Sequence, residues 1–353
     1  MLLSDNSIFG SIIKCHNSIM KTDFLYQAKY GLFIHWTSFS LNKSDKEEMS
    51  SDFEKRFESY KRAVEEFDVA TFVEQVKETG AGFVIMTLNH ADFVLPFPLK
   101  EMDELLPKRK IKRDLLQEII EGMNENNIKF IAYFNGDGFA DKEWQELTGF
   151  YSDPKGHAEY CYKITKAISD KYGKGISGWW IDGCYLIEYN NRSGERYDYR
   201  RYKKCLLSGN EDAIVAFNLN GTEEWKFETE EGVSDYQAGE LVYLDRYPAG
   251  RFSGEAKSQW FSCCYMDDNW VHSSPGKVVS RFSDEEVIDY IKKVNEKGGT
   301  FAYNCALYRN GHFPKAEIIQ LNKIKEALKW QRIIEQRAHK MSRVQDMAKG
   351  LSP

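Results

Sequence analysis

The sequence predicts an α/β fold in which eight strands alternate with helices and close into a TIM-like (β/α)8 barrel. Three observations predict it. Short apolar runs recur along the chain, amphipathic stretches separate most of them, and the runs end in polar or aromatic residues. Unbroken apolar runs are typical of parallel strands covered on both faces, and eight such units favour a closed barrel over an open sheet.

The expected strands are placed by apolar runs that end abruptly. The clearest run, Trp179–Ile181, ends in Asp182 and Gly183, a carboxylate followed by a residue that lets the backbone turn. The stretch 232–237 carries the weakest strand pattern of the eight. The eight expected strands cover residues 31–36, 82–88, 129–135, 179–182, 212–218, 232–237, 258–265 and 300–305.

Capping residues and apolar spacing place the helices. Asp68 and Gly80 delimit one helix as its N-cap and C-terminal stop, and Phe72, Val73 and Val76 share one face of it. Residues 42–66 are rich in Lys, Glu and Ser, which is typical of either a long loop or a solvated helix. Further helices are expected over residues 113–127, 157–172, 199–207 and 284–297.

Length and charge limit the class of protein. We expect one catalytic barrel domain over residues 1–353, with an N-terminal extension over 1–23 and a C-terminal helix over 314–345. The net charge is −6 and no basic stripe is present, so we expect no nucleic-acid partner. No apolar run approaches ~18 residues, so we expect no membrane span. The sequence does not predict an oligomeric state.

The seven cysteines are odd in number and scattered, without a Cys-x-x-Cys pair or a neighbouring histidine cluster. They predict reduced thiols rather than a disulfide framework or a zinc site. Residues 1–20 lack the continuous apolar core of a signal peptide. We therefore expect a cytoplasmic protein, or a secreted one if a leader has been removed.

Polar and aromatic residues follow the expected strands, and in a barrel all of these strand ends lie at one rim. Trp180 and Asp182 are two positions apart on one strand, so their side chains face the same way and can contact one ligand. An indole plane beside a carboxylate suits a sugar ring. Carboxylates on different strands are what glycoside hydrolysis requires. Taken alone, Asp182 could equally cap the following helix.

Six segments, in order between about residues 24 and 330, resemble motifs of the family 29 glycoside hydrolases, the retaining α-L-fucosidases. Ala28–Trp36 is similar to the family's AKFGIFIHWG, and Trp180–Gly183 to its WFDG; these two are specific in combination. The other four similarities are Asn89–Phe93 to HHDGF, Lys112–Leu115 to KRDLV, Asp235–Glu240 to DYxTPE and Lys297–Asn304 to KGGNLLLN.

The resemblance implies a (β/α)-barrel enzyme that releases terminal α-L-fucose, or a fucose-like sugar, from a carbohydrate by a two-step retaining mechanism. It implies Asp182 as the nucleophile and Glu240 as the acid/base, with Glu228, Glu230, Glu231 and Glu255 as nearby alternatives to Glu240. The implied sugar-binding residues are His35, Trp36, Asn89, His90, Tyr133 (or Phe134), Trp180, Asn220 and Trp260.

Neither a metal nor a cofactor is expected. A metal-dependent barrel would place His-x-His on its first strand, where this chain has only His35. No Gly-x-Gly-x-x-Gly motif follows a strand, so a dinucleotide site is not indicated.

Several positions depart from the family motifs. Asn89 replaces the first histidine of a pair, Asn220 stands where arginine is usual, and Phe261 where glutamate is frequent. Ala238 and Gly239 replace the Thr-Pro before the acid, and we expect no C-terminal β-sandwich. Two alternatives therefore stay open: a barrel that binds sugar without efficient catalysis, and a glycosidase of different sugar specificity.

Overall fold

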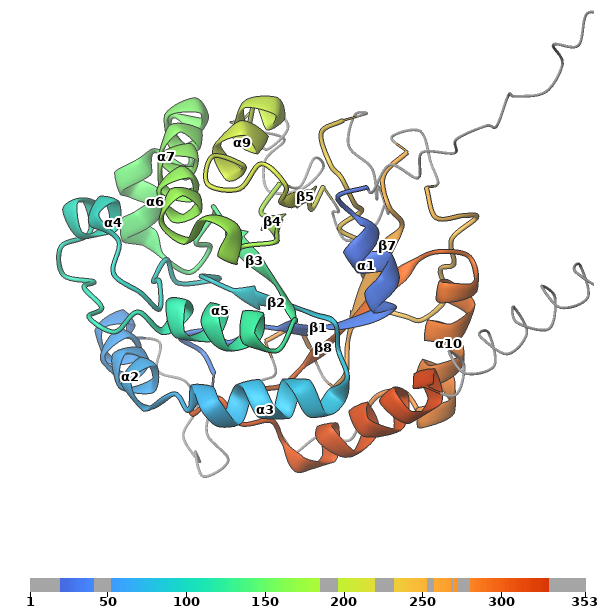
Figure 1. The fold of residues 1–353 in the computed structure, drawn as a ribbon. Coiled ribbons are helices and arrows are strands. Elements are labelled where there is room, and N and C mark those ends of the chain that lie inside the picture. Colours follow the sequence, from blue (N-terminus) through green and yellow to red (C-terminus); the bar gives the residue numbers. More distant parts are fainter. Residues whose placement is uncertain are drawn as a thin grey trace, which may run out of the picture.

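Eight parallel strands curl around a common axis, with the helices on the outside (Figure 1). The computed structural model describes residues 20–40, 52–184, 196–219, 232–252, 257–267, 269–271 and 280–329. The strands are β1 (Tyr30–Ile34), β2 (Phe83–Thr87), β3 (Lys129–Asn135), β4 (Gly178–Asp182), β5 (Ile214–Phe217), β6 (Glu240–Leu241), β7 (Phe261–Tyr265) and β8 (Thr300–Cys305).

The strands are hydrogen-bonded in the order β5-β4-β3-β2-β1-β8-β7-β6. This is the circular order of a (β/α)8 barrel with one interruption, between β5 and β6. The predicted α/β TIM-like fold is confirmed.

Residues 234–237 lie in the interruption. The Asp235 N–H donates to Val215 O of β5 (2.7 Å), and the Gln259 N–H donates to Asp235 O (3.0 Å), so the segment connects β5 to the chain that enters β7. The strand predicted over 232–237 is wrong, because this stretch makes only an isolated bridge through Tyr236. The two-residue β6 begins later, after Gly239, whose φ is +61° and whose missing Cβ would lie 2.0 Å from Phe261 O.

The described residues include the helices α1 (Asp23–Ala28), α2 (Phe53–Glu66), α3 (Val69–Thr79), α4 (Lys100–Leu105), α5 (Leu115–Glu125), α6 (Lys142–Thr148), α7 (Pro154–Tyr172), the 3₁₀ turn η1 (Gly173–Gly175), α9 (Tyr199–Leu206) and α10 (Asp284–Glu296). The capping prediction for α3 is confirmed: Asp68 accepts from the Thr71 N–H, and Gly80 is left-handed. Residues 315–329 are helical. Residues 1–19 and 330–353, which hold most of the expected extension and the end of the expected helix 314–345, lie outside the described residues.

The charged stretch 42–66 contains α2, which is not a solvated helix. Phe57, Tyr60 and Val64 on one face of α2 are buried, whereas its lysines and glutamates face outward. Residues 41–51 lie outside the described part of the chain. The helix is therefore amphipathic, with an apolar stripe at helical spacing among its many charged residues.

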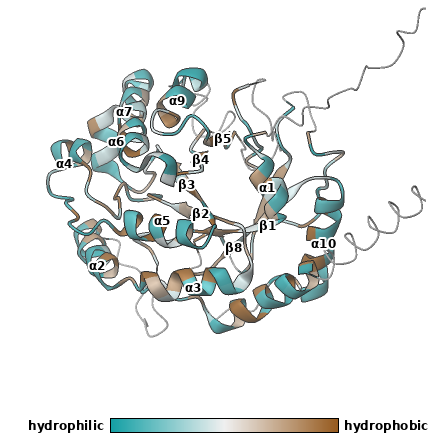
Figure 2. Ribbon diagram, viewed as in Figure 1, coloured by the Kyte–Doolittle hydropathy of each residue, from teal (hydrophilic) through white to brown (hydrophobic). Residues whose placement is uncertain are grey.

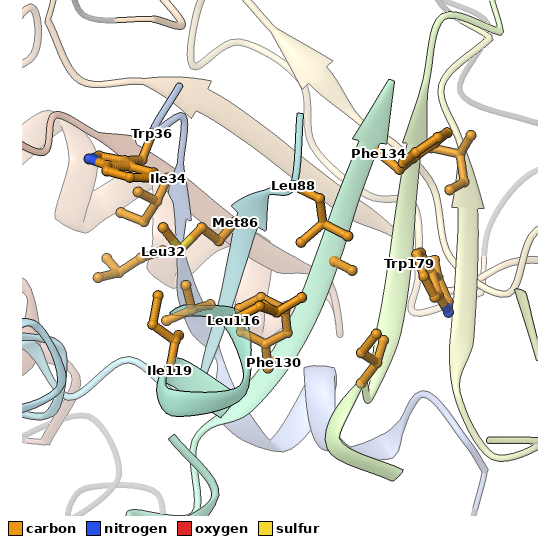
Figure 3. Packing of buried hydrophobic residues seen from close by; sticks show 14 of the residues in the cluster. Leu32, Ile34, Trp36, Met86, Leu88, Leu116, Ile119, Phe130, Phe134 and Trp179 are labelled. Atoms are coloured by element: carbon orange, nitrogen blue, oxygen red, sulfur yellow. The ribbon is translucent and has the colours of Figure 1, made fainter. Parts of the chain in front are cut away.

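Strand alternation divides the core into two layers. Inward side chains, such as Phe33, Tyr133 and Trp180, fill the barrel. Outward side chains, such as Phe134 and Trp179, pack against the helices, and Figure 3 shows part of this outer layer. The helices present hydrophobic residues to the strands and hydrophilic residues outward (Figure 2). Among the described residues, no helix is both long enough and apolar enough to cross a bilayer.

Candidate active site

A cavity of about 280 Å³ opens at the carboxyl ends of the strands. Two acids, Asp182 at the end of β4 and Glu240 at the start of β6, share it. The residues that line the cavity are Phe33, His35, His90, Trp180, Asp182, Glu240, Asn269, Trp270 and Val271.

A single amide group joins the two acids. Asn218 Nδ2, directly after β5, donates to Asp182 Oδ1 (3.0 Å) and to Glu240 Oε2 (2.8 Å). The two N–H bonds of a planar amide diverge by roughly 120°, so the two acceptor oxygens are about 5 Å apart. Acids that are 58 positions apart in the chain therefore converge on one cavity.

Asp182 is buried and accepts further hydrogen bonds from the neighbouring strand β3. The Tyr133 hydroxyl donates to Asp182 Oδ2 (2.5 Å), and Asn135 Nδ2 lies 3.4 Å from the same oxygen. Hydrogen bonds to a carboxylate stabilise its charged form. Asp182 is therefore held in one orientation by donors from β3 and from the residue after β5.

The surroundings of Glu240 have the opposite effect, because they disfavour its charged form. The pKa of Glu240 is raised to about 7: burial is the largest cause, the nearby Asp182 carboxylate adds to it, and the Asn218 hydrogen bond opposes it. One acid is thus surrounded by donors while the other keeps a proton near neutral pH. Paired carboxyl groups with such different environments are typical of acid–base catalysis.

Trp180 forms an aromatic wall of the cavity. Its ring is stacked on that of Tyr133, with centroids 5.3 Å apart and planes inclined by 13°. Its Nε1–H donates to Ala238 O (3.1 Å), which connects β4 to the chain just before Glu240. The indole plane is therefore fixed beside both acids.

Two imidazoles provide polar groups on the other side of the cavity. His35 Nδ1 is 2.8 Å from Asn304 Oδ1, and the rings of His35 and His90 meet edge to face with centroids 5.4 Å apart. Burial lowers the pKa of His90 to about 4, so its imidazole is neutral at physiological pH. His90 Nδ1 is buried without a hydrogen-bond partner among the described residues. A neutral imidazole can donate to or accept from a ligand hydroxyl.

Of the predicted residues, His35, His90, Trp180, Asp182 and Glu240 line the cavity, and Tyr133 contacts it through Asp182. The choice between Tyr133 and Phe134 is made by strand alternation, since Phe134 faces the helices. Asn220 and the alternative acids Glu228, Glu230, Glu231 and Glu255 lie outside the described residues.

Three predicted sugar-binding residues do not line this cavity. Trp36 faces outward, where its ring packs against Tyr60 (centroids 5.3 Å apart) and its Nε1–H donates to Arg309 O (3.2 Å). The Asn89 side chain donates to Asn135 O (2.6 Å) and accepts from the Asn135 N–H (3.0 Å), which connects the ends of β2 and β3. Trp260 is buried in the outer layer.

Two further residues of the site were not among the predicted sugar-binding residues. Trp270 lies in a segment without regular structure, and its ring is 5.7 Å from that of His35. No local pattern marks it. Asn218 is among the polar residues expected at the strand ends, because it directly follows the buried strand β5, as Asp182 ends β4.

A family model described as α-L-fucosidase matches residues 15–332. The chain belongs to the α-L-fucosidase family. It is accordingly a glycosidase of α-L-fucose with a carbohydrate substrate, as the motif resemblance predicted. No curated protein matches the chain.

Solved fucosidase structures share the fold at low identity. α-L-Fucosidase isoenzyme 1 from Paenibacillus thiaminolyticus is 18% identical, with a TM-score of 0.66 over 88% of this chain and 75% of that one. AlfC from Lactobacillus casei, in complex with α-L-fucose product, is 17% identical, with a TM-score of 0.63 over 88% and 99% of the two chains. A Bacteroides thetaiotaomicron fucosidase trapped as a covalent intermediate is 16% identical, with a TM-score of 0.63 over 88% and 74%.

Within the described ranges, no three His, Cys, Asp or Glu side chains are grouped as a metal site would require.

Proposed function

We propose that the chain hydrolyses terminal α-L-fucosides with retention of configuration, with Asp182 as nucleophile and Glu240 as acid/base. The observation that carries this proposal is the shared Asn218 amide, which places one oxygen of Asp182 about 5 Å from one oxygen of Glu240. Retaining glycosidases have this spacing, whereas inverting enzymes need ~6.5–9.5 Å to admit a water molecule.

In the first step, a carboxylate oxygen of Asp182 attacks C1 of the sugar while the bond from C1 to the leaving oxygen breaks. Glu240 transfers its proton to that oxygen, so the alcohol leaves neutral and Glu240 becomes a carboxylate. The pKa of about 7 allows Glu240 to hold this proton near neutral pH. The product is a glycosyl ester on Asp182.

In the second step, the Glu240 carboxylate takes a proton from water as the water oxygen attacks C1. The ester bond to Asp182 breaks and fucose leaves with its original configuration. Ester formation removes the negative charge of Asp182, which is one of the causes of the raised pKa of Glu240. The pKa of Glu240 therefore falls once the intermediate has formed, which favours the carboxylate that accepts a proton from water.

The remaining cavity residues suit a single pyranose ring. The Trp180 indole presents an apolar surface for C–H groups, and the His35 and His90 imidazoles lie where ring hydroxyls require partners. The trapped covalent intermediate of the Bacteroides thetaiotaomicron enzyme supports a two-step route for this family member. The fucose complex of AlfC supports fucose as the occupant.

The test is hydrolysis of a fluorogenic α-L-fucoside by wild type, Asp182→Asn and Asp212→Asn. Asp212 is exposed in the turn before β5 and is the matched control. We expect Asp182→Asn to lose at least ~10³-fold in kcat and to keep its affinity for fucose, while the control stays active. Proton NMR should show the α-anomer of fucose first.

The proposal fails if the folded wild type cleaves no α-L-fucoside, or if the β-anomer appears first. Equal fucose binding by wild type and Asp182→Asn, with no turnover in either, would instead identify a sugar-binding barrel. Preferred cleavage of another aryl glycoside in a small panel would identify a different sugar specificity.

A further inference from the structure

Asn218 is the described side chain that donates hydrogen bonds to both acids of the cavity. It is fully buried, and its own N–H donates to Ile181 O of β4 (2.7 Å), which fixes the backbone at this position. The side chain is therefore anchored beside β4, between the two carboxyl groups. None of the six family motifs includes it.

We propose that Asn218 is a positioning residue that holds Asp182 and Glu240 at the retaining distance and donates to whichever of them carries the negative charge. This inference rests on the proposed function, because it assigns a role to Asn218 within that reaction. An amide nitrogen has two donor hydrogens, and it neither gains nor loses a proton near neutral pH. It can therefore serve two acids at once without joining the proton transfer.

The reaction moves one negative charge across the cavity. Asp182 is the carboxylate before the first step, and Glu240 is the carboxylate while the ester exists. Asn218 Nδ2 donates hydrogen bonds to both carboxyl groups, at 3.0 Å from Asp182 Oδ1 and 2.8 Å from Glu240 Oε2. A donor that is already in place for both states needs no reorganisation during the reaction, and such preorganised donors stabilise transition states most effectively.

Burial disfavours the charged forms of several other titratable groups around Glu240. Burial raises the pKa of Tyr133 on β3 and of Cys263 on β7 well above their usual ranges, and that of Cys264 to about 12. His35 and His90 lie in the same cavity, and burial keeps His90 neutral. Asp182 raises the pKa of Glu240, and the Asn218 hydrogen bond opposes this effect.

The test compares Asn218→Leu, which keeps the shape and removes both donors, with wild type and with Asn210→Leu. Asn210 is the matched control, because it is another buried asparagine whose Nδ2 donates to a backbone oxygen, Ile176 O (2.9 Å), and it does not line the cavity. The measurements are kcat and KM on a fluorogenic α-L-fucoside from pH 4 to 10, with melting temperatures for every variant.

We expect Asn218→Leu to lose ~10²-fold in kcat with a much smaller change in KM. Its alkaline limb should move to higher pH, because loss of the hydrogen bond removes the interaction that lowers the pKa of Glu240. Replacement of an asparagine with a purely structural role would lower the melting temperature without moving the alkaline limb. We expect this result for Asn210→Leu. Asn218→Ala is measured in parallel. If Asn218→Leu does not fold, the loss in kcat and the shift of the alkaline limb are tested on Asn218→Ala instead.

An unchanged alkaline limb together with a loss in kcat below about 3-fold overturns the role of Asn218 and leaves the proposed function intact. A shift of the limb in Asn210→Leu as large as in Asn218→Leu also overturns it. A folded but inactive wild type overturns the proposed function, and this inference with it.

Discussion

The Tyr133 hydroxyl donates a hydrogen bond of 2.5 Å to Asp182 Oδ2. Tyr133 pairs in register with Trp180, so the phenol reaches two residues along β4 to the carboxylate at its end. The tyrosine is buried and stacked on Trp180, and burial raises the pKa of its hydroxyl well above the usual range. The bond therefore has one direction: the tyrosine donates, and Asp182 accepts.

Replacement of Tyr133 by phenylalanine should lower kcat/KM on a fluorogenic fucoside. The variant keeps the stack on Trp180 and removes only the donor to Asp182. Hydrogen bonds to charged groups contribute ~1.5–3 kcal/mol, which corresponds to a loss of roughly 10- to 100-fold. Steady-state kinetics measure it, and activity equal to wild type would show that this bond does not orient the nucleophile. Tyr162→Phe, outside the cavity, is the control.

The pH dependence of the first step should report Glu240. Activity requires its protonated form, so kcat/KM should fall as pH rises through about 7, the raised pKa of this buried acid. Glu240→Gln cannot donate a proton, so this alkaline limb should disappear. We expect a loss of ~10²–10⁴-fold for a sugar leaving group and a smaller loss for an activated phenol. A limb that persists near pH 7 in the variant would assign it to another residue.

Acid should destabilise the fold in part through His157 on α7. Burial, together with the positive charge of Arg196, lowers its pKa to about 3. The unfolded chain binds this proton near pH 6.5, so the contribution of His157 is complete above pH 6.5 and is lost as pH falls toward 3. His157→Gln should flatten the decline in the free energy of unfolding, measured by urea titration at pH 7, 5 and 4. Parallel declines in both proteins would contradict this.

Two tryptophans on opposite sides of the strands should separate stability from activity. Trp36→Leu removes packing against Tyr60 and Phe67 and should cost ~2–4 kcal/mol of unfolding free energy with little change in kcat/KM. Trp180→Leu removes a wall of the cavity and should lower kcat/KM. Denaturant titration and kinetics on the same samples test both. A large loss of kcat/KM in a folded Trp36→Leu protein would return Trp36 to the site.

Local patterns could predict much of this molecule. Continuous apolar runs indicated β1 to β5, β7 and β8, because strands buried on both faces need apolar residues at every position. Asp68 and Gly80 delimited α3 because a capping side chain and a left-handed residue act within one turn of the chain. The interruption between β5 and β6 was not predictable, since residues 234–237 are held by scattered backbone and side-chain hydrogen bonds to β5 and to the approach of β7, with only an isolated bridge in place of a strand.

By itself, the sequence determined that Asp182 ends a buried strand and that Trp180 shares its face, because alternation along one strand is a local property. Only the tertiary structure decided that Trp36 faces the helices, that Tyr133 rather than Phe134 reaches Asp182, and that one Asn218 amide joins two acids. These relationships depend on how strands distant in the chain are placed around the barrel. Burial and periodicity follow from residues close together in the chain. A separation of about 5 Å between an oxygen of Asp182 and an oxygen of Glu240 exists only once the barrel has formed.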